Sequence, residues 1–189
     1  MNFIDLNKTD SNRIILGRAG KYVAFMHNIS GDFTFEITAS DVDLDIFGLF
    51  NGKGDTAFKI NTVQHHKAPR SKSNLLIKGV FNDQSKFNYQ GLIKIEKEGQ
   101  GTHAYQKNQN IILSPDVFIA SEPFLEILAN DVFCTHGSTT GQLNEEELYY
   151  LNARGVEYNQ AKELLIQGFL QEVFDKLKDA GVNNLYARH

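Results

Sequence analysis

The stretch CTHGSTTGQLNEEELYYLNARG, residues 134–155, marks the point where the sequence changes from the pattern of β-strands to the pattern of α-helices. It begins with Cys134, the only cysteine of the chain, and His136 follows two residues later. A turn rich in glycine and threonine then leads into an acidic, leucine- and tyrosine-containing run that favours helix. We therefore expect a β-rich domain over residues 1–141 and a helical segment over residues 142–189.

The first helix of this segment is expected over residues 145–153. Asn144 is a suitable N-cap, and Glu147 stands three residues later, which together predict a capping box. Gly155 is expected to end the helix, because glycine readily adopts the left-handed conformation that follows many helix C-termini.

A second helix is expected over about residues 159–178, with Gly181 as its C-terminal cap. Leu165, Phe169 and Val173 recur at a spacing of four and form part of a broad apolar stripe. Helices of this length are not stable alone in water, so the stripe must pack on the β-rich domain or on another protein.

The β-rich region shows a hydrophobic period of two, as in FTFEIT at 33–38, VDLDIF at 42–47 and FKINTV at 58–63. These runs predict strands with one face buried. Turn signals interrupt them about every ten residues; the turns are expected at 28–32, 51–55, 66–71, 82–85 and 96–101.

This alternation fits a β-sandwich, a jelly roll or a β-solenoid, because each of them buries one face of every strand. One observation favours the solenoid. The apolar runs at 74–81 and 110–120 lack the two-residue Asn-Gly or Asp-Gly loops of tight hairpins, which leaves room for longer corners between parallel coils.

The composition is that of a globular protein without a nucleic-acid footprint. The 189 residues carry a formal net charge of −4, and the basic residues form no stripe, so we expect no nucleic-acid partner. No apolar run approaches the roughly 20 residues of a membrane span. A single cysteine cannot form an internal disulfide, and the N-terminus resembles no export signal, so we expect a reducing cytoplasm.

Cys134 and His136 are the candidate metal ligands. On a strand, residues i and i+2 point to one face, where a thiolate and an imidazole can share a metal ion. Closed sites have about four ligands, so the others must come from elsewhere in the chain or from a second subunit. His65, His66 and His103 are candidates within the chain, although the first two fit solvated corner residues better. A buried, unreactive cysteine is the alternative for Cys134.

Other catalytic signatures are missing. The sequence holds no GxxxxGK[ST] phosphate loop, no HExxH and no GxSxG. We therefore expect no nucleotide hydrolysis, zincin proteolysis or α/β-hydrolase chemistry by this chain.

An ordered set of motifs resembles one known family. C-x-HG-x-T-x-GQL from Cys134 is followed by Y-x-x-x-RG from Tyr150 and by A-x-x-LL-x-x-GF from Ala161. This order resembles the SufB/SufD family, the scaffold proteins of SUF iron–sulfur cluster assembly. The resemblance covers about residues 57–178, and usual members are more than twice as long. A minimal homologue and one half of a split gene are both compatible with that difference.

The resemblance implies a right-handed parallel β-helix with a C-terminal helical segment. It also implies a non-catalytic scaffold whose last coils pair with a SufB/SufD-type second subunit or with another copy of the chain. The helical segment would bind a SufC-type ABC ATPase, with Leu165, Phe169 and Val173 as partner-binding residues. Cys134 and His136 match the SufD-type motif, with His136 placed at the subunit interface where a transient iron–sulfur cluster forms.

The motif resembles the SufD branch more than the SufB branch. SufB-type chains carry a glutamate on each side of the histidine, whereas Thr135 and Gly137 flank it here. The strand near Asn108, where SufB-type chains place a sulfur-accepting cysteine, has none.

Two other functions stay open from the sequence. One is a purely structural subunit that binds the ATPase while Cys134 stays buried and unreactive. The other is a β-solenoid protein that acts on polysaccharides, which would present a row of acidic or aromatic residues along one face.

Overall fold

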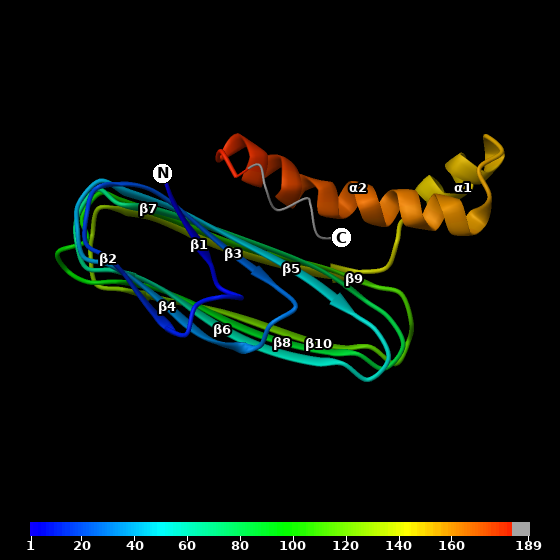
Figure 1. Cartoon of the computed structure of the whole chain (residues 1–189), viewed down its shortest axis with the longest axis horizontal. Helices are drawn as coiled ribbons and strands as arrows, with labels where there is room; N and C mark the ends of the chain where they lie inside the picture. Colours follow the sequence, from blue (N-terminus) through cyan, green and yellow to red (C-terminus); the bar gives the residue numbers. More distant parts are fainter. Residues whose placement is uncertain (183–189) are drawn as a thin grey trace.

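The chain folds as a parallel β-solenoid followed by two helices in a computed structural model that describes residues 1–182 (Figure 1). Successive strands alternate between two sheets, and every strand pair is parallel. The six-stranded sheet contains β1 (Asn2–Asp5), β3 (Gly20–His27), β5 (Val42–Gly52), β7 (Lys72–Phe81), β9 (Thr102–Ile112) and β11 (Val132–Gly141). The five-stranded sheet contains β2 (Arg13–Leu16), β4 (Gly31–Ile37), β6 (Ala57–His66), β8 (Lys86–Ile95) and β10 (Phe118–Ile127).

This topology decides among the three folds that alternation left open. A sandwich and a jelly roll are built from antiparallel strands. Here each strand lies in register on the strand two positions earlier, so Asn74 bonds to Asp45 at a separation of 29 residues and Lys94 bonds to Glu126 at 32. The predicted solenoid and its two C-terminal helices are confirmed.

The corners between strands stack on one another at both ends of the coils. Asn28, Asp41, Arg70 and Asp83 have positive φ, which is uncommon for residues other than glycine and fits tight corners. Arg70 donates two hydrogen bonds, of 3.1 and 2.8 Å, to the carboxylate of Asp41 in the preceding coil. Bonds between corners therefore help to hold the coils in register.

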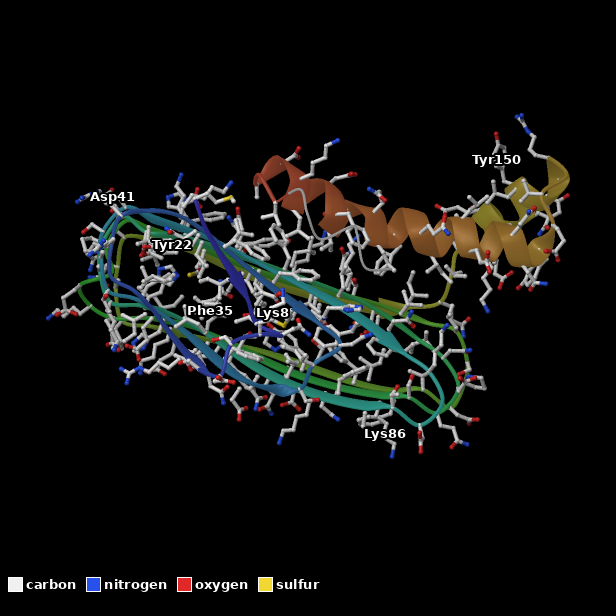
Figure 2. The ribbon with its side chains drawn as sticks, viewed as in Figure 1. Lys8, Tyr22, Phe35, Asp41, Lys86 and Tyr150 are labelled. Atoms are coloured by element: carbon white, nitrogen blue, oxygen red, sulfur yellow. The ribbon has the colours of Figure 1, made fainter. Side chains whose placement is uncertain are left out.

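An apolar core fills the first coils between the two sheets. Phe35 is fully buried and points into this interior in Figure 2. The rings of Phe50 and Phe81 lie 4.9 and 5.0 Å from the ring of Phe87. Such offset aromatic pairs add to the stabilisation from apolar burial.

Farther along the stack the interior becomes polar. His66 is fully buried, and its two ring nitrogens lie 2.7 Å from Ser71 Oγ and 2.8 Å from Ser73 Oγ. Gln64 donates to Ser73 Oγ at 2.7 Å. Burial, with a smaller effect of neighbouring His65, lowers the pKa of His66 to about 4, so the imidazole is neutral near pH 7.

The two helices lie where the sequence predicts them. They are α1 (Glu145–Ala153) and α2 (Tyr158–Asp179). Asn144 accepts a hydrogen bond from Glu146 N at 2.9 Å, which confirms the N-cap. Neither bond of the predicted capping box, to Glu147 N or from the Glu147 side chain, is present in the described structure. Gly155 and Gly181 have φ of +87° and follow the helix ends in Schellman motifs, as expected.

The C-terminal half of α2 packs on the outer face of the six-stranded sheet (Figure 1). Val173 and Leu177 are fully buried against side chains of β3, β5 and β7, which are Val23, Phe25, Phe47, Leu49 and Leu76. Lys78 of β7 is also buried, donates to Phe169 O at 2.7 Å and pairs with Glu172.

In residues 1–182 no helix has the length and apolarity to span a bilayer.

The interior position of Ile60 predicts a large cost for its truncation. Ile60→Ala should lower the free energy of unfolding by about 2–5 kcal/mol, because Ile60 is fully buried between the sheets. Ile15 is 61% exposed on the same sheet, so Ile15→Ala should change the free energy of unfolding by less than about 0.5 kcal/mol. Urea unfolding of both variants measures these changes. Equal losses of unfolding free energy in the two variants would contradict the interior position of Ile60.

The buried imidazole predicts a pH dependence of stability. Because the pKa of His66 falls from 6.5 to about 4 on folding, the unfolded chain binds a proton in this window that the folded chain does not. The contribution of His66 to stability is therefore complete above pH 6.5, and about 3 kcal/mol is lost as the pH falls to about 4. His66→Gln should flatten the dependence of urea midpoints on pH between 6.5 and 4.5. An unchanged slope would contradict a neutral buried His66.

Candidate functional site

Cys134 and His136 lie on β11, the last strand of the six-stranded sheet. Their in-register neighbours on β9 are Ala104 and Gln106, both of which are buried inside the solenoid. Because side chains alternate between the two faces of a strand, Cys134 and His136 both point to the interior side of the last coil. Cys134 is half-buried and His136 is exposed. The two candidate ligands therefore share one face at the open end of the stack.

Apolar side chains surround Cys134. It packs with Val132 against a small buried cluster that contains Ile93, Ile95 and Ala104. Burial raises the pKa of the Cys134 thiol, and a hydrogen bond with the backbone of Ala104 opposes this in part. The thiol is therefore protonated near pH 7 and must lose its proton before it can bind a metal ion.

None of the three other candidate histidines joins this pair. His65 and His66 point to opposite faces, as expected for adjacent residues on a strand. His66 is no solvated corner residue, because it is buried and its two ring nitrogens face serine hydroxyls. His65 points outward and contacts Glu96 Oε1 at 2.7 Å. His103 is exposed on the outer face of β9, where its ring lies 6.0 Å from that of Phe133.

The ligand set within one chain is incomplete. Across residues 1–182, no three or more His, Cys, Asp and Glu side chains come together in a way that could hold a metal ion. A thiolate and an imidazole both suit iron, so the chemistry of the pair fits an iron–sulfur species. A closed site of about four ligands needs at least two more from another chain.

Three buried carboxamides lie in the coil directly below Cys134 and His136, and their burial was not predicted. Gln106, Asn108 and Asn110 alternate along β9 and are each at most 3% exposed. Asn110 donates to Asn108 Oδ1 at 2.7 Å and to Thr140 Oγ1 at 3.4 Å. The alternation of apolar and polar residues along a strand assigns polar side chains to the outer face. The interior position of these three carboxamides follows only from the place of β9 in the stack.

The last coil exposes apolar side chains and unpaired strand edges. β10 and β11 end their sheets, and each has ten residues, whereas β1 and β2 at the other end have four. Side chains between 37% and 62% exposed gather on this coil; they are Phe118, Phe124, Leu125, Ile127, Leu128 and Phe133. A long apolar edge of this kind invites pairing with another chain.

The helical segment divides into a docked part and an exposed part. Val173 is fully buried against the sheet of its own chain, so it is not available to a partner in this arrangement. Leu165 and Phe169 are half-buried, and the ring of Phe169 lies 4.3 Å from Lys78 Nζ. The exposed apolar and aromatic side chains, more than half accessible, are Tyr149, Tyr150, Tyr158 and Leu164. Figure 2 shows Tyr150 projecting away from the solenoid.

A cavity of about 490 Å³ lies between α2 and the six-stranded sheet. Its charged lining residues are Lys21, Asp45, Lys107, Glu172, Lys176 and Asp179. Three cations and three carboxylates balance each other, so the cavity favours neither an anion nor a cation. Cys134 and His136 do not line it.

Comparison with known proteins relates the chain to iron–sulfur cluster assembly. It is 27% identical over 172 residues to the iron–sulfur cluster assembly protein SufD of Escherichia coli K12, which is 91% of this chain and 39% of that protein. A SufBD family protein of Synechocystis is 34% identical over 58% of this chain and 24% of its own length. A SufBD family protein of Mycobacterium leprae is 30% identical over 71% of this chain and 36% of its own length.

The chain therefore spans between about a quarter and two fifths of the length of these curated relatives. Residues 6–169 match the family described as SUF system FeS cluster assembly, SufBD core domain. That match contains β2 to β11, Cys134, His136 and the first half of α2. The chain belongs to the SufBD core domain family of the SUF system for iron–sulfur cluster assembly.

Proposed function

We propose that this chain is a non-catalytic scaffold subunit of a SUF-type assembly complex in the reducing cytoplasm. It couples a SufC-type ATPase to the formation of an iron–sulfur cluster at a subunit interface. The observation that carries this proposal is the position of Cys134 and His136 on the open terminal coil, in a chain that matches the SufBD core domain. Iron and sulfide are cargo for the scaffold, and ATP is hydrolysed by the partner.

The terminal coil is the surface that binds a second subunit of the SufBD type, either another copy of this chain or a related chain. Its ten-residue strands leave a row of unpaired backbone groups at each sheet edge, next to exposed phenylalanine and leucine side chains. The opposite end of the stack is poorly suited to this role, because β1 and β2 have only four residues each.

Pairing at this edge would complete the ligand set. Each chain supplies one thiolate and one imidazole, and two subunits that meet at β11 bring two such sets together. The neutral state of Cys134 keeps the site unreactive until iron displaces the thiol proton. The half-buried, apolar environment of Cys134 supports one alternative, a structural subunit in which this thiol stays inert.

The division of the chain into a solenoid domain, residues 1–141, and a helical segment, residues 142–189, remains part of this proposal. We place the ATPase contact on the first half of α2, at the exposed Tyr158 and Leu164 with the half-buried Leu165 beside them. Residues 183–189 lie outside the described part of the chain. The SufD-like character of the motif also remains a proposal, supported by the similarity to the E. coli protein.

Substitutions on the exposed face of α2 should weaken binding of the ATPase and leave the fold intact. Tyr158→Ser combined with Leu164→Ser should weaken binding of a SufC-type ATPase by about 30-fold or more, because exposed aromatic and apolar anchors contribute about 2 kcal/mol or more at such interfaces. The measurement is an anaerobic pull-down from host lysate with the full chain as bait, followed by titration of the purified ATPase.

Ile15→Ser is the matched control, since Ile15 is 61% exposed on the five-stranded sheet and far from the helices. Recovery of the ATPase with wild type and Ile15→Ser, but not with the double variant, supports this docking face. Failure to recover any ATPase with wild type would contradict the coupling role.

Substitution of Cys134 or His136 should reduce the iron that the chain retains and leave its fold stable. Cys134→Ser and His136→Ala should each reduce iron retained after anaerobic reconstitution by about tenfold or more, because each removes one direct ligand. Urea midpoints should stay close to wild type, because both side chains lie on the open coil. His103→Ala is the control, since His103 points to the outer face of the neighbouring strand.

Equal iron retention in Cys134→Ser, His136→Ala and wild type would contradict the cluster site. It would support the structural subunit in its place, because that function needs the fold and the docking surfaces but neither ligand.

A further inference from the structure

Polar side chains in register on neighbouring coils regularly bond to each other in this solenoid. Parallel strands lie about 4.8 Å apart, so side chains at matched positions are within reach of one another. Five such pairs are bonded, at distances from 2.5 to 3.4 Å; they are Asp32–Asn61, Asp45–Asn74, Gln90–Glu122, Lys94–Glu126 and Asn110–Thr140. The last pair joins β9 to β11, the strands that carry the candidate site.

Gln106 and His136 are also in register on β9 and β11, yet no bond joins them in residues 1–182. Gln106 is 1% exposed, and neither Nε2 nor Oε1 of its side chain has a hydrogen-bond partner. An orphaned carboxamide of this kind is rare inside proteins, because burial removes its hydrogen bonds to water. His136 directly above it is exposed.

The backbone opposite Gln106 makes room for its amide. A β-carbon at Gly91 of β8 would lie 2.0 Å from Gln106 Nε2 and 2.4 Å from the hydroxyl of Tyr89, so any other residue would displace the amide. The amide group therefore occupies the space left by the missing side chain, in the coil immediately below the one that bears His136. Pro123 of β10 lies in register above Gly91 and provides no hydrogen-bond donor to Gln106.

We infer that Gln106 is a positioning residue for His136, an inference that rests on the proposed function of His136 as a ligand. In the metal-bound state its Oε1 accepts a hydrogen bond from one ring N–H of His136, and the other ring nitrogen binds the metal ion. A metal-bound histidine almost always donates its second ring N–H to such an acceptor, which fixes the tautomer and the orientation of the ring. Gln106 is the acceptor that the fold places in register with it.

The test is metal binding by the full chain, with Co²⁺ as a spectroscopic probe and under anaerobic conditions. Gln106→Met removes both polar atoms at similar size and should weaken Co²⁺ binding by about 10–100-fold, with a shift of the ligand-field bands. Gln106→Glu keeps an acceptor of the same length and should retain affinity within about threefold of wild type.

Gln64→Met is the matched control. Gln64 is likewise a fully buried interior glutamine with an unpaired Oε1, but its in-register neighbours are Phe35 and Ile93 rather than His136. Gln64→Met also replaces a buried interior amide by an apolar side chain of similar size, and it should leave the Co²⁺ affinity unchanged. If Gln106→Met does not fold, Gln106→Asn keeps the amide but shortens its reach, and should show the same loss of affinity.

The outcomes separate the two claims. Wild-type affinity in Gln106→Met or Gln106→Asn, together with lost affinity in His136→Ala, would overturn the positioning role and leave the ligand role intact. Wild-type affinity in His136→Ala would overturn both. Equal loss of affinity in Gln64→Met and Gln106→Met would assign the effect to general weakening of the interior and would also overturn the positioning role.

A second readout does not depend on affinity. In ¹⁵N-labelled chain loaded with Zn²⁺, the ring nitrogens of His136 should report a single tautomer in wild type and in Gln106→Glu. Gln106→Met should show a mixture of tautomers. A single tautomer in all three chains would contradict the inferred hydrogen bond.

Discussion

The in-register stacking of parallel coils is the constraint on which the rest of this structure depends. Most interior side chains lie directly above a side chain of the preceding coil, so each coil limits the size and polarity that the next can accept. In the first coils this produces a stack of aromatic and aliphatic residues around Phe35 and Phe87. In the later coils the same rule brings hydroxyls, carboxamides and His66 together, and the bonds among them satisfy many of the buried polar atoms.

The same constraint explains why the candidate site lies at the end of the stack. A cysteine or histidine in a middle coil has neighbours above and below, as His66 does, and its polar atoms are bonded within the chain. In the last coil one neighbour is missing. Cys134 and His136 therefore have the interior orientation of core residues together with the accessibility of surface residues.

How well each part could be predicted depended on the range of the interactions that determine it. The helix ends were predicted to within a residue because N-caps and C-terminal glycines act locally. The strands were predicted by their period of two, but that period does not identify the partner of a strand. The missing two-residue hairpin loops and the family resemblance favoured the parallel solenoid. The burial of Gln106 was not predicted, and His66 was predicted to face solvent. Both errors arise because the hydrophobic period of two assigns polar residues to the outer face of a strand. Burial of Val173 on the chain's own sheet was one of two open possibilities, because an apolar helical stripe does not reveal which surface covers it.

The docking of α2 across the six-stranded sheet gives the molecule a mechanical property. The helix touches side chains of β3, β5 and β7, so a pull on its N-terminal half is shared by three coils instead of peeling one strand from the edge. Lys78 pins it near the point where it leaves the sheet. A force that acts on many contacts at the same time separates two surfaces less easily than a force that breaks the contacts one after another. A force on the helix therefore acts on three coils of the solenoid at once.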